Sequence, residues 1–367
     1  MLEPSFQPDW FSKPGDTLLT LMEQRELSSE DLARKLGCEH SVVQGLLSGV
    51  VALDDGLANA LSRHVGGTPT FWRARQTKYL AALARAAEAV PKERGSNWVK
   101  QFPHRDIAKY GWLDRNAKRD ELVRAYLAYF GVNTPDEWSE RYERSMKETA
   151  FRTSPTFASK LGAISAWLRR GEIEAAATPC STWHPKRLKE SLNAIRVLSK
   201  AKSPAYFLPR VRKICAEAGV AVVFVRAPAG CSASGATKFI SPDKAMIVLS
   251  FRYLSDDHFW FSFFHELGHL LLHKSSMTFV DGKPGISGDL ESEANEFAAN
   301  VLIPPSRRDE LMDLPAQREP IIRFAYSVGV STGIVVGQLQ HRSIIRRNQM
   351  NRLKRHFNWQ EISKVAT

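Results

Sequence analysis

The sequence predicts a mainly helical α+β protein, and two observations lead to this prediction. Apolar residues recur at helical spacing through most of residues 14–200. Three short runs of strand-like composition follow at 220–225, 237–240 and 245–249, directly before a long apolar helix. A small sheet packed against helices gives an α+β core.

Composition is that of an ordinary globular protein. The chain has 367 residues, 43% hydrophobic and 25% charged, so more than one domain is expected. No apolar run approaches the length of a membrane span, and the first residues do not resemble a signal peptide. The four cysteines are far apart and form no CxxC pair. We therefore expect reduced thiols, a cytoplasmic location and no membrane partner.

The net charge of +12 is unevenly distributed along the chain. Residues 73–147, 148–220 and 341–367 carry +6, +8 and +6, whereas residues 14–72 and 221–340 carry −4 and −3. A basic middle and tail can bind the phosphates of single- or double-stranded nucleic acid. The same charges also suit a solvated helical surface, so composition leaves both interpretations open.

Residues 14–80 have the pattern of a helix-turn-helix bundle. A first helix is predicted over residues 14–26. A short second helix is predicted between Ser28, a candidate N-cap, and Gly37, a candidate C-cap. A third helix is predicted over residues 41–47. In such a tandem, the later helix enters the major groove of DNA.

This stretch resembles the Cro/repressor class of helix-turn-helix domains, specifically antitoxins of the HigA type, and the phrase Gly-Thr-Pro-Thr-Phe-Trp at 67–72 fits that subgroup. The third helix contains no arginine or lysine, which is a poor match for a phosphate backbone. DNA binding and a role in homodimerisation or partner docking therefore both remain open. The side chains expected at base edges are Ser29, His40, Ser41, Val42 and Gln44.

Residues 90–200 show helical patterns without catalytic motifs. Breaks between helices are predicted at 95–96, 133–135 and 178–179, where glycine or proline interrupts the pattern.

The most specific motif is His265-Glu-Leu-Gly-His269, an HExxH box in an apolar helix. Histidines four apart lie on one face of a helix, so both imidazoles can bind one tetrahedral zinc ion. Glu266 can take a proton from a water on the metal as that water attacks a carbonyl, and return it to the leaving amine. Gly268 is expected to keep space open beside the metal. The box predicts one zinc per chain and a peptidase.

A third protein ligand is expected from a later helix. Position 275, where a third histidine would follow in one known pattern, is serine, and His273 is expected on the surface or behind the ligands. The acidic helix predicted over 289–303 offers Glu291, Glu293 and Glu296. We predict Glu291, with Glu293 as the alternative, because Asn295 follows Glu291 by one turn and can hydrogen-bond a ligand histidine. An HExxH box with a distant glutamate is gluzincin-like.

Two further features allow regulatory interpretations. Cys231 lies in a glycine- and serine-rich loop over 228–235, where it is either a passive loop residue or an inhibitory zinc ligand. Residues 324–337 and the basic run over 342–355 are either a helical cap on the core or a nucleic-acid sensor.

The HExxH box, the helix that carries Glu291 and ends at Pro304, and the strands before them resemble the ImmA/IrrE family of metallopeptidases. With the HigA-like module in front, nearly the whole chain resembles fused helix-turn-helix/ImmA-IrrE proteins. The resemblance implies a zincin-like core and a bacterial regulator that cleaves a repressor or antitoxin, often after DNA damage or other stress. The alternative is a DNA-binding regulator or antitoxin whose protease site is secondary or vestigial.

Five segments are expected on this reading of the sequence. They are an N-terminal arm (1–13), the helix-turn-helix domain (14–85), a helical middle region (86–200), the metallopeptidase core (201–310) and a basic C-terminal helical region (311–367).

Overall fold

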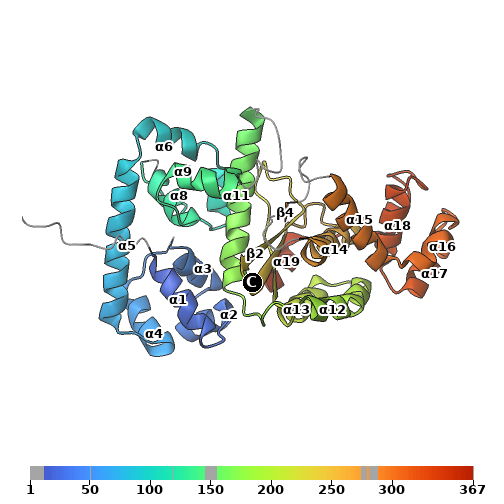
Figure 1. The fold of residues 1–367 in the computed structure, drawn as a ribbon, viewed down its shortest axis with the longest axis horizontal. Helices are drawn as coiled ribbons and strands as arrows, with labels where there is room; N and C mark the ends of the chain where they lie inside the picture. The colour runs from blue at the N-terminus through green and yellow to red at the C-terminus, as the bar shows by residue number, and fades with distance from the viewer. Residues whose placement is uncertain are drawn as a thin grey trace, which may run out of the picture. The chain divides into compact units, whose positions relative to one another are not determined.

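The computed structural model describes residues 12–49, 51–118, 120–144, 155–273, 279–280 and 288–366. These residues divide into two compact units. Unit 1 holds the described residues of Met1–Met146, Thr153–Pro179 and Pro228–Gly230, and unit 2 those of Cys180–Ala227 and Cys231–Thr367. Helices dominate both units, and a small sheet lies in unit 2 (Figure 1), so the predicted helix-rich α+β class is confirmed.

Every secondary-structure element described in unit 1 is a helix or helical turn. Its elements are α1 (Pro14–Glu23), α2 (Ser29–Leu36), α3 (His40–Ser48), α4 (Asp55–Val65), α5 (Pro69–Ala89), α6 (Lys92–Val99), α7 (His104–Lys109), α8 (Leu122–Phe130), α9 (Pro135–Trp138), the π-helical turn η1 (Ser139–Arg144) and α11 (Pro155–Ala176).

The first four helices enclose an apolar core. Helix α2 begins after Ser28, whose hydroxyl accepts a hydrogen bond from the Asp31 amide at 3.0 Å, and it stops at Gly37, where φ is 66°. Helices α2 and α3 therefore match the predicted boundaries to within a residue or two, whereas α1 ends three residues early, at Glu23. The buried core residues include Leu18, Met22, Leu32, Val43, Leu46 and Leu61.

Aromatic side chains fill the interior of the middle region. The predicted break at 95–96 is wrong, because α6 runs through Gly95. A Cβ atom at that position would lie 2.8 Å from Cγ2 of Val123, so glycine allows α6 to pack close to α8. The breaks at 133–135 and 178–179 are confirmed. The aromatic cluster consists of Trp98, Phe102, Tyr126, Phe130 and Trp138.

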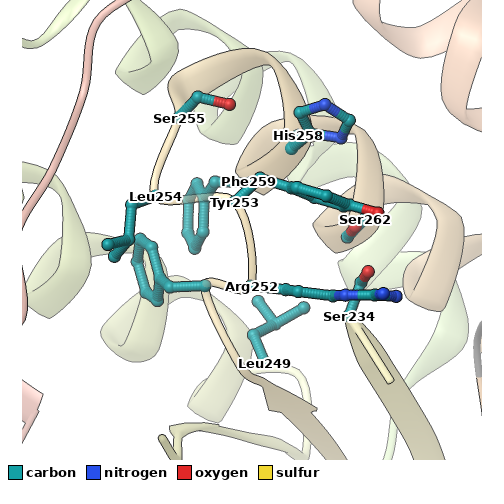
Figure 2. Close-up of a pocket in the computed structure, with 10 residues that line it drawn as sticks. Ser234, Leu249, Arg252, Tyr253, Leu254, Ser255, His258, Phe259 and Ser262 are labelled. Carbon is teal, nitrogen blue, oxygen red and sulfur yellow. The ribbon is translucent and has the colours of Figure 1, made fainter. Parts of the chain in front are cut away.

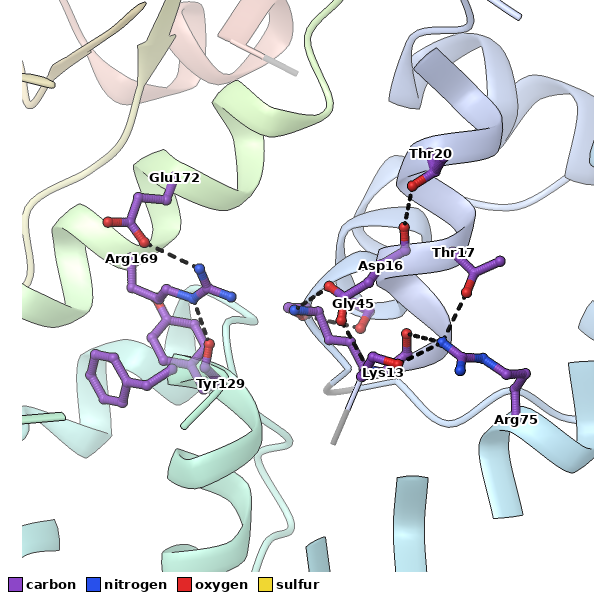
Figure 3. A network of polar contacts seen from close by, with 12 residues as sticks. Lys13, Asp16, Thr17, Thr20, Gly45, Arg75, Tyr129, Arg169 and Glu172 are labelled. Carbon is purple, nitrogen blue, oxygen red and sulfur yellow. Dashed lines mark hydrogen bonds and ion pairs between the residues drawn. The ribbon is translucent and has the colours of Figure 1, made fainter. Parts of the chain in front are cut away.

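Polar contacts on α11 and at the start of α1 are drawn in Figure 3. The guanidinium of Arg169 donates to the Tyr129 carbonyl at 2.8 Å and pairs with the Glu172 carboxylate at 3.1 Å. The ammonium of Lys13 pairs with Asp16 at 3.0 Å. Burial, together with the nearby charge of Arg169, lowers the pKa of Lys13. The buried Arg169 thus has a carboxylate partner within α11, and its hydrogen bond to the Tyr129 carbonyl joins α11 to α8.

Unit 2 contains a four-stranded sheet of order β1-β3-β2-β4 within its described residues. Strand β1 (Val220–Phe224) is parallel to β3 (Lys244–Leu249), whereas β2 (Gly235–Ser241) is antiparallel to both β3 and β4 (Phe279–Val280). The three predicted strands are therefore confirmed. Every residue of β1 is buried, which explains its unbroken run of apolar residues.

Helix α14 (Asp256–Leu272) lies at the centre of unit 2 and contacts β2, β3, α15 and α18. Most of its residues are buried, as its apolar flanks predict. The other helical elements of this unit are α12 (Pro185–Val197), η2 (Leu198–Lys200), α13 (Pro204–Ala216), α15 (Gly288–Leu302), η3 (Pro305–Arg307), α16 (Arg308–Met312), α17 (Arg318–Val328), α18 (Thr332–His341), η4 (Asn351–Leu353) and α19 (Trp359–Ala366).

The basic C-terminal region packs onto the start of α14. Leu339 and Phe357 belong to the same apolar core as α14. The Lys354 ammonium pairs with the Asp257 carboxylate at 2.6 Å, and the Arg355 amide donates to Asp256 at 3.0 Å. These contacts support the interpretation of this region as a helical cap on the core.

Among the described residues, no single helix has the length and apolar character needed to cross a membrane. The pair α17 and α18 meets that test of length and composition only when the two are taken together, and they are bent by 109°.

Candidate metal centre

Two helices of unit 2 position the candidate ligands. Helix α14 carries His265 and His269 one turn apart, each 2% exposed. Helix α15 lies against Gly268, where a Cβ atom would be 3.1 Å from Cδ1 of Phe297 and 3.2 Å from Cα of Ala294. The expectation that Gly268 opens space beside the metal is therefore wrong. Its missing side chain instead lets α15 approach α14 closely enough for both helices to contribute to one site.

Ligand-type atoms from three side chains converge between these helices. Nε2 of His265 and Nε2 of His269 are 3.0 Å apart. The Glu291 carboxylate lies 3.3 Å from the first nitrogen and 3.5 Å from the second. Donor atoms at about 2.0–2.1 Å from a tetrahedral zinc ion are about 3.3 Å from one another, so the cluster fits zinc in donor type and in size. Within the described residues, it is the one such group of His, Cys, Asp and Glu.

The electrostatics of the cluster favour metal binding at neutral pH. Burial opposes ionisation of Glu291, but hydrogen bonds with His265 and His269 outweigh burial and lower the pKa of this carboxyl to about 2. Burial lowers the pKa of His269 below its usual value of 6.5. At neutral pH, Glu291 is therefore an anion and His269 is neutral, which are the protonation states that metal ligands need.

The other ring nitrogen of each histidine also has a partner. Nδ1 of His265 lies 3.0 Å from Oδ1 of Asn295, so the expected contact between Asn295 and a candidate ligand histidine is present. Nδ1 of His269 lies 2.9 Å from Nδ1 of His273, whose Nε2 is 3.1 Å from the Glu293 carboxylate. An amide oxygen only accepts hydrogen bonds, so His265 carries its proton on Nδ1 and directs the lone pair of Nε2 into the cluster.

The Glu266 side chain is enclosed between α14 and β2. Its exposure is 0%. A Cβ atom at Gly235, the first residue of β2, would lie 2.6 Å from Oε1 of Glu266. Gly235 was expected in a flexible loop and carried no motif that marked it. A glycine just before a predicted strand was the one available signal, and glycine in strands often marks a close approach.

A small cavity borders the N-terminal half of α14 (Figure 2). Its lining includes Ser234 and Ser262, and Ser262 precedes Glu266 by about one turn on the same face of the helix. The loop before α14 bends sharply, with φ of 51° at both Phe251 and Leu254. The cavity volume of about 10 Å³ accommodates about one water molecule and no substrate side chain.

The other candidates from the sequence lie outside the three-residue cluster. Glu293 pairs with His273, and the carboxylate of Glu296 is 67% exposed and faces Arg308 at 3.8 Å. Cys231 is partly buried and is not a member of the cluster. This geometry favours Glu291 over Glu293 as the third ligand.

The residues expected to read DNA lie in unit 1, on or before α3. Gln44 is 4% exposed, and its amide oxygen accepts a hydrogen bond from an arginine of α11. Ser29 is also buried, and its hydroxyl lies 2.7 Å from Nε2 of His40. Val42 is partly exposed, and the side chain of Ser41 lies outside the described part of the structure. DNA reading by these residues stays a prediction, and the contacts within the protein already engage three of them.

Comparison with known protein families gives a match to the segment that carries the His265–His269–Glu291 cluster. Residues 215–339 match the peptidase M78 family model, which is described as the IrrE N-terminal-like domain. The matched segment extends from the end of α13 to α18, and it contains the sheet, α14 and α15. No curated protein matches the chain. Peptidases of this family are generally zinc-dependent, so residues 215–339 are similar to the metallopeptidases of the ImmA/IrrE type.

Proposed function

We propose that the chain is a zinc-dependent endopeptidase of the gluzincin-like kind. The observation that carries the proposal is the convergence of His265, His269 and Glu291 beside the buried Glu266, within the segment that matches a metallopeptidase family. Three protein ligands with one open position are typical of catalytic zinc sites.

Each residue of the centre has its own task. His265, His269 and Glu291 would hold the metal through two Nε2 atoms and one carboxylate. Zinc bound there supplies a Lewis acid and lowers the pKa of water. The carboxylate of Glu266 accepts the proton of the attacking water and returns it to the nitrogen of the leaving amine. Enclosure by β2 and α14 limits the positions that this carboxylate can adopt.

We further propose that the substrate is a protein partner of the repressor or antitoxin type, cleaved in response to DNA damage or another stress. The resemblance to ImmA/IrrE proteins and a separate helical bundle at the N-terminal end support this choice. A regulatory peptidase of this kind would act on a chosen partner rather than on unfolded proteins in general.

The deciding experiment compares cells carrying the wild type with cells carrying Glu266→Gln, before and after DNA damage. Proteomics should find one or a few proteins whose cleavage products disappear in the variant. Purified Glu266→Gln should retain about one zinc per chain, because its ligands are unchanged. Glu296→Gln, on the exposed face of α15, is the matched control and should cut normally. A folded Glu266→Gln protein that still cuts would exclude the role given to Glu266.

A further inference from the structure

Two series of side-chain hydrogen bonds lead to the histidine cluster, and one is longer than the other. His265 contacts Asn295 directly at 3.0 Å. His269 instead contacts His273 at 2.9 Å, and His273 contacts Glu293 at 3.1 Å. The second series ends on a carboxylate that the metal cluster itself does not use.

The position of the protons in the second series follows from the chemistry of the rings. Nε2 of His269 faces Nε2 of His265 and the carboxylate of Glu291, so a metal held there needs the Nε2 lone pair. A neutral His269 then carries its proton on Nδ1 and donates it to Nδ1 of His273. His273 must in turn carry its own proton on Nε2, which is the nitrogen that faces Glu293.

We propose that His273 and Glu293 are positioning residues that orient His269 for metal binding. This inference rests on the proposed metal centre and assigns a role to two residues beyond its ligands. Glu293 accepts from Nε2 of His273 and so selects the tautomer whose Nδ1 is an acceptor. His273 then holds the ring of His269 with Nε2 directed at the metal position.

The end of α14 explains why His273 can reach back to His269. The helix stops at Leu272, and His273 has φ of −113° and ψ of 167°, which is extended backbone. Residues four apart lie on one helical face, so this position at the end of the helix places the His273 ring beside His269. The His273 side chain is 3% exposed, and its ring contacts both neighbours.

The hydrogen bond between Glu293 and His273 matters because the His273 ring is buried. The carboxylate of Glu293 is 58% exposed, so its hydrogen bond with His273 alone contributes little to the stability of the protein. The His273 ring is buried, however, and its other tautomer would place two N–H donors face to face with His269. A buried donor without an acceptor is unfavourable, so the exposed carboxylate controls the geometry of a buried ligand through His273.

The test measures metal binding by the full-length protein, independently of peptide cleavage. Protein stripped of metal is titrated with zinc against a chromophoric chelator, and with Co²⁺ to record the d–d absorption spectrum. We expect His273→Ala to weaken zinc binding about 10- to 100-fold and to change the Co²⁺ spectrum. Glu293→Ala should weaken binding in the same direction, and Glu293→Gln, which keeps an acceptor, should recover much of the loss. Glu296→Ala is the matched control on α15 and should leave affinity and spectrum unchanged.

The double variant His273→Ala/Glu293→Ala decides whether Glu293 acts through His273. If it does, the double variant binds zinc no more weakly than His273→Ala alone. Additive losses, or a Glu293→Ala protein with the affinity and spectrum of the wild type, would overturn the proposal. Because Glu293 is more than half exposed, its variants test the relay even if His273→Ala does not fold. A wild-type protein that binds neither metal would instead overturn the metal centre itself.

Discussion

A Cβ atom added to Gly235 would lie 2.6 Å from Oε1 of Glu266 and 2.8 Å from its Cγ. The first residue of β2 therefore packs directly on the candidate catalytic carboxylate. Glu266 is 0% exposed, so a side chain at Gly235 could be accommodated only if the carboxylate or the strand shifted. The sheet thus positions the Glu266 side chain as well as supporting the helix that carries it.

We expect Gly235→Ala to lower peptidase activity about 100-fold while leaving zinc content near one per chain. The added methyl group displaces the Glu266 carboxylate, and a displacement of about 1 Å at a reacting group can cost that much. Cleavage assays and zinc analysis of the purified variant test this expectation. Gly56→Ala is the control, because a Cβ atom there meets Asp54 at an ordinary 3.4 Å. Equal activity of the two variants would contradict the prediction.

Asn295→Ala should weaken zinc binding by about 10-fold or more, because His265 loses the oxygen that accepts its Nδ1 proton. Asn295→Asp keeps an acceptor at that position and should bind zinc close to wild-type strength. Competition titration of zinc measures both variants. An Asn295→Ala protein that binds zinc as tightly as the wild type would show that the contact with His265 has no influence on metal binding.

Lys354→Met should destabilise unit 2 by about 3–5 kcal/mol, because it leaves the carboxylate of Asp257 buried without its cation. Urea unfolding of the variant measures the change. Arg187→Met removes an exposed pair with Glu217 and should cost less than about 1 kcal/mol. If the two variants unfold at the same urea concentration, the buried pair does not stabilise the start of α14.

The pair between Asp257 and Lys354 also predicts a pH dependence. Burial opposes ionisation of Asp257, but hydrogen bonds from Lys354 and Ser255 outweigh it and hold the pKa of Asp257 below 3.8. A depressed pKa stabilises the folded state above pH 3.8, and that contribution is lost as the pH falls through the lower folded value. The free energy of unfolding of the wild type should fall as the pH is lowered below about 5. Asp257→Asn should show a smaller fall, because it lacks the carboxylate that is protonated. An unchanged acid profile would contradict this assignment.

Gln44→Ala should lower the stability of unit 1 by about 1–3 kcal/mol, because the partly buried guanidinium of Arg170 loses the acceptor that the buried Gln44 amide supplies. Binding to a random DNA duplex, measured by fluorescence anisotropy, should be unchanged. The buried Gln44 has no surface to offer a base edge in this packing. Loss of DNA binding at unchanged stability would restore Gln44 to the recognition role expected from the sequence.

Local patterns were sufficient for most elements. The cap at Ser28 and the left-handed glycine at 37 determine the ends of α2, and the short apolar runs determine β1 and β3. The spacing of His265 and His269 places both on one helical face without any knowledge of the fold. These features depend on residues only a few positions apart, which is why the sequence predicts them.

Glycine was the residue most often misread from the sequence. Gly95 was expected to break a helix and Gly268 to open a cavity, yet each allows one helix to pack closely against another. Whether a glycine serves a turn, leaves an empty space or allows close packing depends on the atoms that face it in the folded protein. The opposing atoms belong to Val123 and Ala294, which are distant in sequence, so no local pattern contained the answer.

The sequence by itself determined the HExxH box, the acidic helix that offers a third ligand, and the helices and strands that carry them. Only the tertiary structure decided which glutamate lies beside His265 and His269. Glu291 and Glu293 are two residues apart, so on a helix they point about 200° apart, and the packing of α15 on α14 selects which of them meets the histidines. Packing at Gly268 brings Glu291 to the two Nε2 atoms and leaves Glu293 beside His273.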